Sequence, residues 1–87
     1  MWDFSRKSKF RTQYKKLPQK IQNKVDEALI ALASSTKPRL LGTYKQSIGV
    51  WAYELDDSYR MLYNVKDSEN LIELFRVGDH KEVYGKD

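Results

Sequence analysis

The stretch from Ile48 to Tyr84 reads IGVWAYELDDSYRMLYNVKDSENLIELFRVGDHKEVY, and its spacing decides the fold. From Gly49 to Leu55, large apolar residues alternate with smaller or charged ones, a period of two that is typical of a half-buried strand. The same alternation runs through Tyr59 to Lys66, and a third apolar segment runs from Leu71 to Val77. Two short polar runs separate the three segments, and Gly78 is expected to end the last one. The stretch therefore predicts an antiparallel meander of three strands.

The first turn fixes which residues face one another. A three-residue loop, Asp56 to Ser58, would pair Glu54 with Arg60 and Ala52 with Leu62 across the hairpin. The aromatic residues then share the other face of the sheet, which we expect to be the core side: Trp51, Tyr53, Leu55, Tyr59, Met61 and Tyr63. Arg60 is consequently predicted to lie on the opposite, open face.

The N-terminal half predicts a helical hairpin. Apolar residues recur at i, i+4 and i+7 among lysines and arginines, at positions Phe10, Tyr14 and Leu17. Ser5 is the expected cap of this helix, and Pro18 separates it from the next one. The second helix has the stronger pattern, with Ile21, Val25, Ala28, Leu29 and Leu32 at helical spacing.

The apolar stripe of this hairpin, about Ser5 to Ser35, must be covered, and the aromatic face of the meander is the available surface. Trp2 and Phe4 flank Asp3 and are interpreted as one edge strand. We therefore expect an α+β fold in a single domain, residues 1–87, with an N-terminal strand and a two-helix hairpin packed on one face of an antiparallel β-meander.

Composition excludes several classes of function. Cysteine is absent and His80 is the single histidine, so we expect no disulfide framework and no metal site. No apolar run has the length of a membrane span, and the N-terminus lacks a signal-peptide core, so we expect a soluble, cytoplasmic protein.

The net charge of +4 is unevenly distributed along the chain. Residues 1–45 carry a balance of +8 and residues 46–87 a balance of −4. A basic half favours an anionic partner, of which nucleic acid is the usual one. A solvated, lysine-rich helical surface is the alternative.

Several short motifs occur in an order that resembles a known family. They are a Leu-Pro break between two helices, Leu41-Gly42, Gly49-Val50-Trp51, Tyr59-Arg60-Met61-Leu62-Tyr63 and Val77-Gly78-Asp79-His80-Lys81-Glu82-Val83-Tyr84. Together they resemble the RelE/ParE superfamily of toxins from bacterial and archaeal toxin–antitoxin modules. This resemblance implies a β-α-α-β-β-β fold.

Resemblance to the RelE branch implies a ribosome-dependent endoribonuclease that cuts messenger RNA without a metal or another cofactor. In that chemistry the ribose 2′-hydroxyl attacks the adjacent phosphate, which requires a base, an acid and cations around the transition state. The implied partners are a cognate antitoxin protein and the ribosome with bound mRNA.

The resemblance also assigns roles to single residues. Arg60 matches a strand arginine that neutralises the scissile phosphate, and Tyr84 matches a tail tyrosine that stacks on or orients a base. His80 lies where some relatives have a general acid, with Lys81 beside it. The alternatives are structural: Arg60 pairing with Glu54, and Tyr84 fixing the tail to the core.

The sequence departs from the RelE toxin at two lysine positions, which correspond to Ala52 and Glu54 here. A Glu54 base with a His80 acid is one replacement, and Lys45 is a substitute cation. Lysines of the two helices are expected either to bind ribosomal RNA phosphates or to be solvated, among them Lys15, Lys16 and Lys20. Two alternatives remain: a ParE-like toxin that inhibits DNA gyrase without nuclease activity, and a degenerate toxin that only binds its antitoxin.

Overall fold

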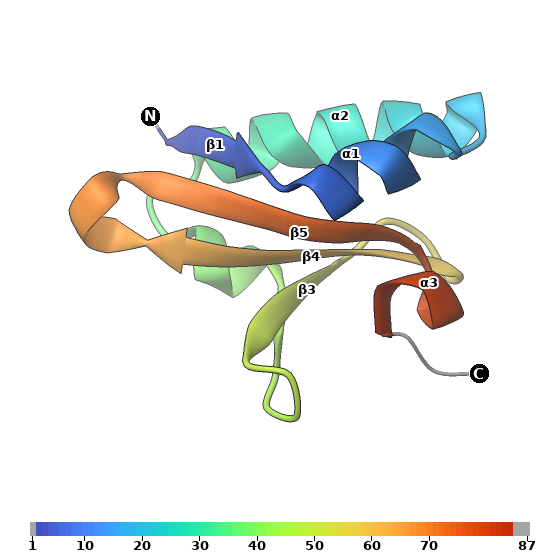
Figure 1. The fold of residues 1–87 in the computed structure, drawn as a ribbon. Helices are drawn as coiled ribbons and strands as arrows, with labels where there is room; N and C mark the ends of the chain where they lie inside the picture. The colour runs from blue at the N-terminus through green and yellow to red at the C-terminus, as the bar shows by residue number, and fades with distance from the viewer. Residues whose placement is uncertain (1, 85–87) are drawn as a thin grey trace.

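The structure is a computed structural model that describes residues 2–84, and it contains a five-stranded sheet in the order β1-β5-β4-β3-β2 (Figure 1). The strands are β1 (Asp3–Arg6), β2 (Thr43–Lys45), β3 (Val50–Glu54), β4 (Tyr59–Lys66) and β5 (Leu71–Asp79). The helices are α1 (Ser8–Lys15), α2 (Gln19–Ser34) and α3 (His80–Tyr84), with short 3₁₀ turns η1 (Pro38–Leu41) and η2 (Asp67–Glu69). The predicted α+β fold is confirmed: β3, β4 and β5 form the antiparallel meander, and β1 pairs with β5 in parallel.

The register of the first hairpin is the predicted one. Glu54 pairs with Arg60, and Ala52 pairs with Leu62. The Asp56 carboxylate closes the loop by accepting hydrogen bonds from the backbone N–H groups of Ser58 (2.8 Å) and Tyr59 (2.9 Å). These two bonds stabilise the ionised form and lower the pKa of Asp56.

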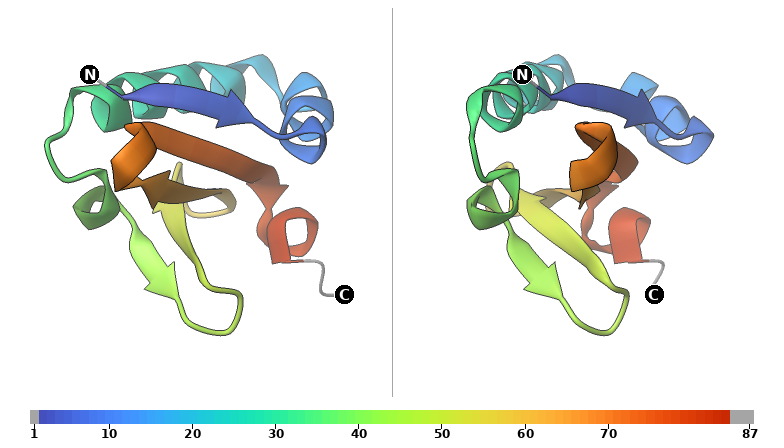
Figure 2. Two further views of the ribbon diagram at one scale, coloured as in Figure 1. Left: turned by 60° about the vertical axis from the view of Figure 1, so that its left-hand side comes forward. Right: turned by 90° about the vertical axis from the view of Figure 1, so that its left-hand side faces the viewer.

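Helices α1 and α2 cover one face of the sheet, and Figure 2 shows them on the side opposite α3. The predicted stripe of α2 is buried against the aromatic side of the meander, where Met61 and Tyr63 are fully buried. The Tyr63 hydroxyl donates a 2.7 Å hydrogen bond to the Pro38 carbonyl, and burial raises the pKa of Tyr63 to about 12. The predicted core side of the sheet is therefore confirmed.

Three local expectations were wrong. Ser5 lies in β1 and does not cap α1; the N-cap is Lys7, which makes no side-chain capping bond within residues 2–84. Pairing of β1 with β5 holds this segment extended, which overrides the helical pattern. Gly78 does not end the third strand, because β5 continues through it to Asp79 and Arg60 pairs with it. The first strand of the meander begins at Val50 and not at Gly49.

Two elements were not predicted. Strand β2 is only three residues long and pairs with β3 at the edge of the sheet. Helix α3 packs on the face that we expected to be open, where its Val83 is buried with Ala52 and Leu62 in a second, small apolar cluster. That face is therefore partly covered, and Phe75 and Tyr84 border the cluster.

Candidate active site on the sheet face beside α3

Arg60 is held firmly on β4 by its own hairpin. Its Nη1 donates hydrogen bonds to the carbonyl oxygens of Asp56 (2.8 Å) and Tyr59 (3.2 Å). Its Nη2 lies 3.8 Å from the Glu54 carboxylate, which is too long for a hydrogen bond. The expected cross-strand ion pair thus exists, but the Glu54 side chain is 70% exposed and the pair contributes little to stability. A guanidinium has five N–H donors, so donors on Nε and Nη2 remain for a ligand.

Helix α3 begins with a reciprocal capping arrangement. The Asp79 carboxylate accepts a 3.0 Å hydrogen bond from the backbone N–H of Glu82, and the Glu82 carboxylate accepts a 3.1 Å bond from the backbone N–H of Asp79. Such a capping box satisfies two N–H groups that a helix start otherwise leaves unpaired. The cap fixes the point at which the chain leaves β5, and with it the position of His80.

Gln13 of α1 connects the helical layer to this site. Its side chain is buried; its oxygen accepts a 3.0 Å hydrogen bond from the Val77 N–H, and its nitrogen donates a 3.1 Å bond to the Glu82 carbonyl. Strand β1 pairs with β5 only as far as Leu74, so the amide of Gln13 replaces the missing strand at Val77. One side chain therefore positions both the end of β5 and α3.

His80 and Tyr84 lie one helical turn apart, and their rings are in contact, with centroids 4.5 Å apart and planes tilted by 57°. Burial raises the pKa of Tyr84, the positive charge of Arg60 opposes this shift, and the negative charge of Glu54 adds to it. The phenol is therefore close enough to both charged groups to feel them. The structure brings together four of the predicted site residues: Glu54, Arg60, His80 and Tyr84.

The predicted cations lie in different places. Lys81 is exposed on α3, next to His80, and Lys45 is half-buried on β2, opposite Val50. The three helical lysines lie in the other layer of the molecule, apart from this group, and all are exposed: Lys15, Lys16 and Lys20.

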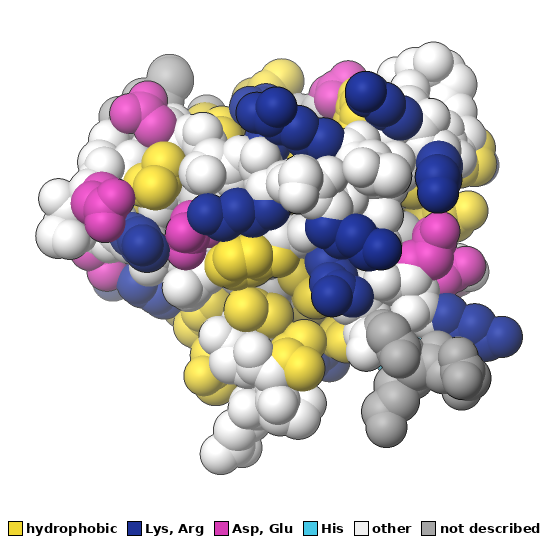
Figure 3. All heavy atoms as spheres, in the orientation of Figure 1, with side chains coloured by type: hydrophobic (Ala, Val, Ile, Leu, Met, Phe, Trp, Pro, Cys, Tyr) yellow, Lys and Arg dark blue, Asp and Glu magenta, His cyan; other side chains and the backbone are white. Residues whose placement is uncertain are grey.

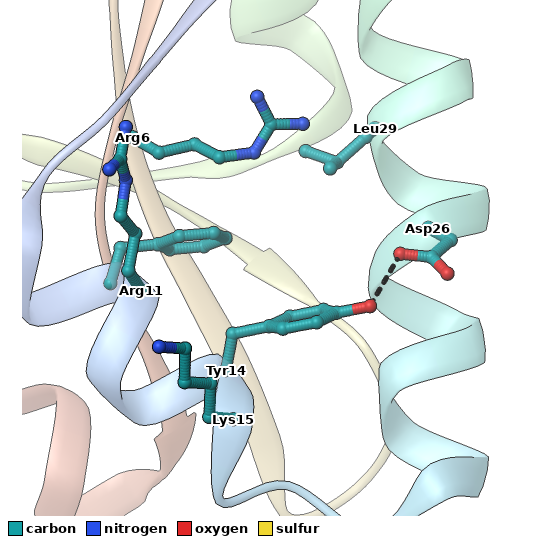
Figure 4. A pocket seen from close by; sticks show the side chains of 7 residues that line it. Arg6, Arg11, Tyr14, Lys15, Asp26 and Leu29 are labelled. Carbon is teal, nitrogen blue, oxygen red and sulfur yellow. Dashed lines mark hydrogen bonds between the residues drawn. The ribbon is translucent and has the colours of Figure 1, made fainter.

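A cavity of about 500 Å³ lies in that other layer, between β1, α1 and α2 (Figure 4). Tyr14 reaches across it and donates a 2.9 Å hydrogen bond to Asp26 of α2. Burial, followed by this bond, raises the pKa of Tyr14. Arg6, Arg11 and Lys15 border the cavity, which is a basic hollow distinct from the sheet face.

Sequence reasoning missed four residues that shape the candidate site. Gln13 looked like one polar residue of an amphipathic helix, and only its burial reveals its role. The Asp79–Glu82 spacing is a capping-box signal that the sequence contains, and it would have found α3. Arg76, half-buried on β5, lines the same sheet face and was not singled out.

Two absences hold for the part of the chain that the structure describes. None of the helices within residues 2–84 combines the length and apolarity that a membrane crossing requires. The same residues contain no group of three or more His, Cys, Asp or Glu side chains placed to hold a metal ion.

Comparison with solved structures identifies the class of fold. The chain is similar to the RelBE2 toxin–antitoxin complex from Mycobacterium tuberculosis (TM-score 0.75, 22% identity, covering 91% of this chain and 98% of that one). It is also similar to the isolated E. coli RelE toxin (TM-score 0.75, 18% identity, covering 98% and 93%) and to the archaeal RelE–RelB complex from Pyrococcus horikoshii OT3 (TM-score 0.70, 16% identity, covering 90% and 93%). The fold is that of the RelE toxins.

The family follows from the sequence itself. The family model described as the ParE toxin of the type II toxin–antitoxin system, parDE, matches residues 5–84. The chain therefore belongs to the ParE toxin family, within the RelE/ParE toxin superfamily. A search of curated proteins found no match.

Proposed function

We propose that this type II toxin is a ribosome-dependent endoribonuclease that cleaves messenger RNA by attack of a ribose 2′-hydroxyl on the adjacent phosphate. The observation that carries the proposal is the meeting of Glu54, Arg60, His80 and Tyr84 on one face of the sheet. The carboxylate, the guanidinium and the imidazole can supply the base, the cation and the acid that such a reaction requires, and the phenol can stack on a base.

Each group has a role that its position supports. Arg60 stabilises the negative charge that the phosphate gains in the transition state, and its fixed geometry means that little reorganisation is needed. Glu54, exposed beside it, accepts the proton of the 2′-hydroxyl. His80 donates a proton to the leaving 5′-oxygen, and Tyr84 orients the adjoining nucleotide by stacking.

The proposed partners are a cognate antitoxin protein and the cytoplasmic ribosome with its bound messenger. The RelBE2 and archaeal RelE–RelB structures are complexes of a toxin with its antitoxin, which supports an antitoxin for this chain. For the ribosome, cations on both layers support binding to RNA phosphates. They are Lys45 and Lys81 near the sheet face and Lys15, Lys16 and Lys20 on the helices.

Inhibition of DNA gyrase without cleavage is the second candidate. It is favoured by the description of the matching family as a ParE toxin and by the residues at the two lysine positions of the RelE toxin. Here Ala52 is 2% exposed beneath Val83, and Glu54 is negatively charged. Neither position supplies a cation.

One experiment separates the candidates. Purified protein is added to translating ribosomes and the new messenger ends are mapped, while a parallel sample is assayed for inhibition of gyrase supercoiling. The nuclease proposal predicts new ends only when ribosomes are present, with 5′-hydroxyl and cyclic phosphate termini. Inhibition of gyrase with intact messenger would replace it with the second candidate. Absence of both activities, together with tight antitoxin binding, would identify a degenerate toxin.

A further inference from the structure

Strand β5 contains a bulge that turns two neighbouring side chains to the same face. The register with β4 shifts between Leu62 and Tyr63, because Leu62 pairs with Arg76 and Tyr63 pairs with Leu74. Phe75 is the extra residue between them. Leu74 stays in the core beneath the helices, whereas Phe75 and Arg76 both line the sheet face beside α3. Bulges re-aim side chains in this way and are frequent next to active sites.

The two residues line a cleft of about 300 Å³, which we call the bulge cleft. Its floor is aliphatic, from Val50, Leu62 and Val83. Phe75 and Tyr84 supply two aromatic rings. On the molecular surface in Figure 3, hydrophobic side chains gather around β3 and are bordered by Lys and Arg side chains. The bulge cleft thus combines flat apolar walls with an adjoining cation.

Arg76 supplies that cation. None of the ion pairs among residues 2–84 involves it, in contrast to Arg60 and Arg39, which are paired with Glu54 and Asp67. A half-buried guanidinium beside an apolar cleft, with no carboxylate bound to it, favours an anionic group on whatever occupies the cleft.

The bulge cleft is continuous with the candidate active site. Arg60 and Leu62 are two residues apart on β4 and point to the same face, while Gly78 and Arg76 are their partners on β5. Two residues of a strand span about 7 Å. This repeat is similar to the separation of neighbouring phosphates along an extended single strand. Tyr84 belongs to both sites.

We infer that the bulge cleft binds one unpaired nucleobase next to the scissile phosphate, and that Arg76 binds the phosphate of that nucleotide. The inference rests on the proposed nuclease function. The base lies against Phe75 and Tyr84, because single-stranded RNA is recognised by splaying out bases and stacking them on aromatic side chains. Arg76 fixes the register of the strand, because phosphate contacts set position and not sequence. The cleft is therefore a positioning subsite, which places one base at a set distance from the scissile phosphate.

A trinucleotide tests the inference without needing cleavage. RNA trinucleotides carrying 2′-O-methyl groups cannot react, and their binding to the purified protein can be followed by NMR chemical shifts. The parent is expected to show saturable shifts at Phe75 and Tyr84. Arg76→Gln should weaken binding about tenfold, and it should reduce the slope of log affinity against log salt by about 0.7, as loss of one phosphate contact to a single strand requires. Phe75→Leu should weaken binding at least about fivefold, because stacking is lost.

Lys37→Gln is the matched control, since it removes one positive charge from an exposed residue outside both sites. Each variant is first checked for an unchanged thermal midpoint. Equal affinity and equal salt slope for the parent, Arg76→Gln and Lys37→Gln would overturn the inference. The absence of any chemical-shift change at Phe75 and Tyr84 on adding the trinucleotide to the parent would also overturn it.

Failure of the inference and failure of the nuclease proposal can be told apart. If the parent cleaves ribosome-bound messenger and Arg76→Gln leaves both trinucleotide affinity and the cleaved positions unchanged, the bulge cleft is wrong and the proposed function stands. If the parent cleaves no messenger but binds the trinucleotide in an Arg76-dependent way, the cleft is supported and the proposed function is wrong.

Discussion

Removing the Gln13 side chain should lower the free energy of unfolding more than removing any exposed polar side chain of the helices. In Gln13→Ala, the buried Val77 N–H loses its acceptor and the Glu82 carbonyl loses a donor. A buried polar group left without a hydrogen-bond partner lowers the free energy of unfolding by about 1–3 kcal/mol. A loss near the middle of this range, about 2 kcal/mol, lowers the thermal midpoint by about 8–16 °C in a domain of this size.

Urea and thermal unfolding, followed by circular dichroism, measure the loss. Gln19→Ala is the matched control, because the Gln19 amide makes a 2.9 Å hydrogen bond to Asn23 in solvent, and its removal should cost less than about 0.5 kcal/mol. If the two variants had the same unfolding free energy, the view that Gln13 holds β5 and α3 in place would be refuted. Gln13→Glu keeps an acceptor for the Val77 N–H but has no donor for the Glu82 carbonyl, so it should loosen α3 and slow cleavage.

Three further outcomes are expected. Tyr63→Phe should lower the unfolding free energy by about 1 kcal/mol through its lost hydrogen bond. It should also make the fall in stability between pH 10 and about 12 shallower than in the parent, because the contribution of a group with a raised folded pKa is lost as the pH rises. Asp56 and Asp67 have lowered pKa values, so their contribution to folding stability is complete above pH 3.8 and is lost as the pH falls below that value. If stability fell with acid in the same way in Asp56→Asn and in the parent, this would be contradicted for the hairpin. Ribosome binding should weaken steeply with rising salt. If the affinity stayed constant over a severalfold range of salt concentration, the helical lysines would not contact RNA phosphates: Lys15, Lys16 and Lys20.

The layers of the fold could be predicted because periodicity records which face is buried. The alternation through β3 and β4 placed Met61 and Tyr63 in the core, and the helical spacing of α2 placed Val25 and Leu32 against them. The polar loop after β3 fixed the pairing of that strand with β4, and so placed Arg60 on the face that carries the candidate site.

The features that could not be predicted depend on contacts between residues that lie far apart in the sequence. Helix α3 has five residues, too few for a periodic signal, and it is held by Val83 packing on Leu62 and by Gln13. The bulge at Phe75 has no local signature, because it becomes visible only when β5 is aligned with β4. For this reason Arg76 could not be assigned to the sheet face from sequence alone.

The most direct test of the nuclease account compares the parent with Arg60→Ala and Glu54→Ala in the mapping of messenger ends on translating ribosomes. Removing one contact to a developing negative charge costs about 2.7–4 kcal/mol, so Arg60→Ala should cleave about a hundred- to a thousandfold more slowly while keeping its fold. A comparable loss in Glu54→Ala is expected if Glu54 is the base, whereas a simple ion-pair partner can be removed with little effect. Cleavage by Arg60→Ala at the rate of the parent would contradict the assignment of this face as the site of RNA cleavage.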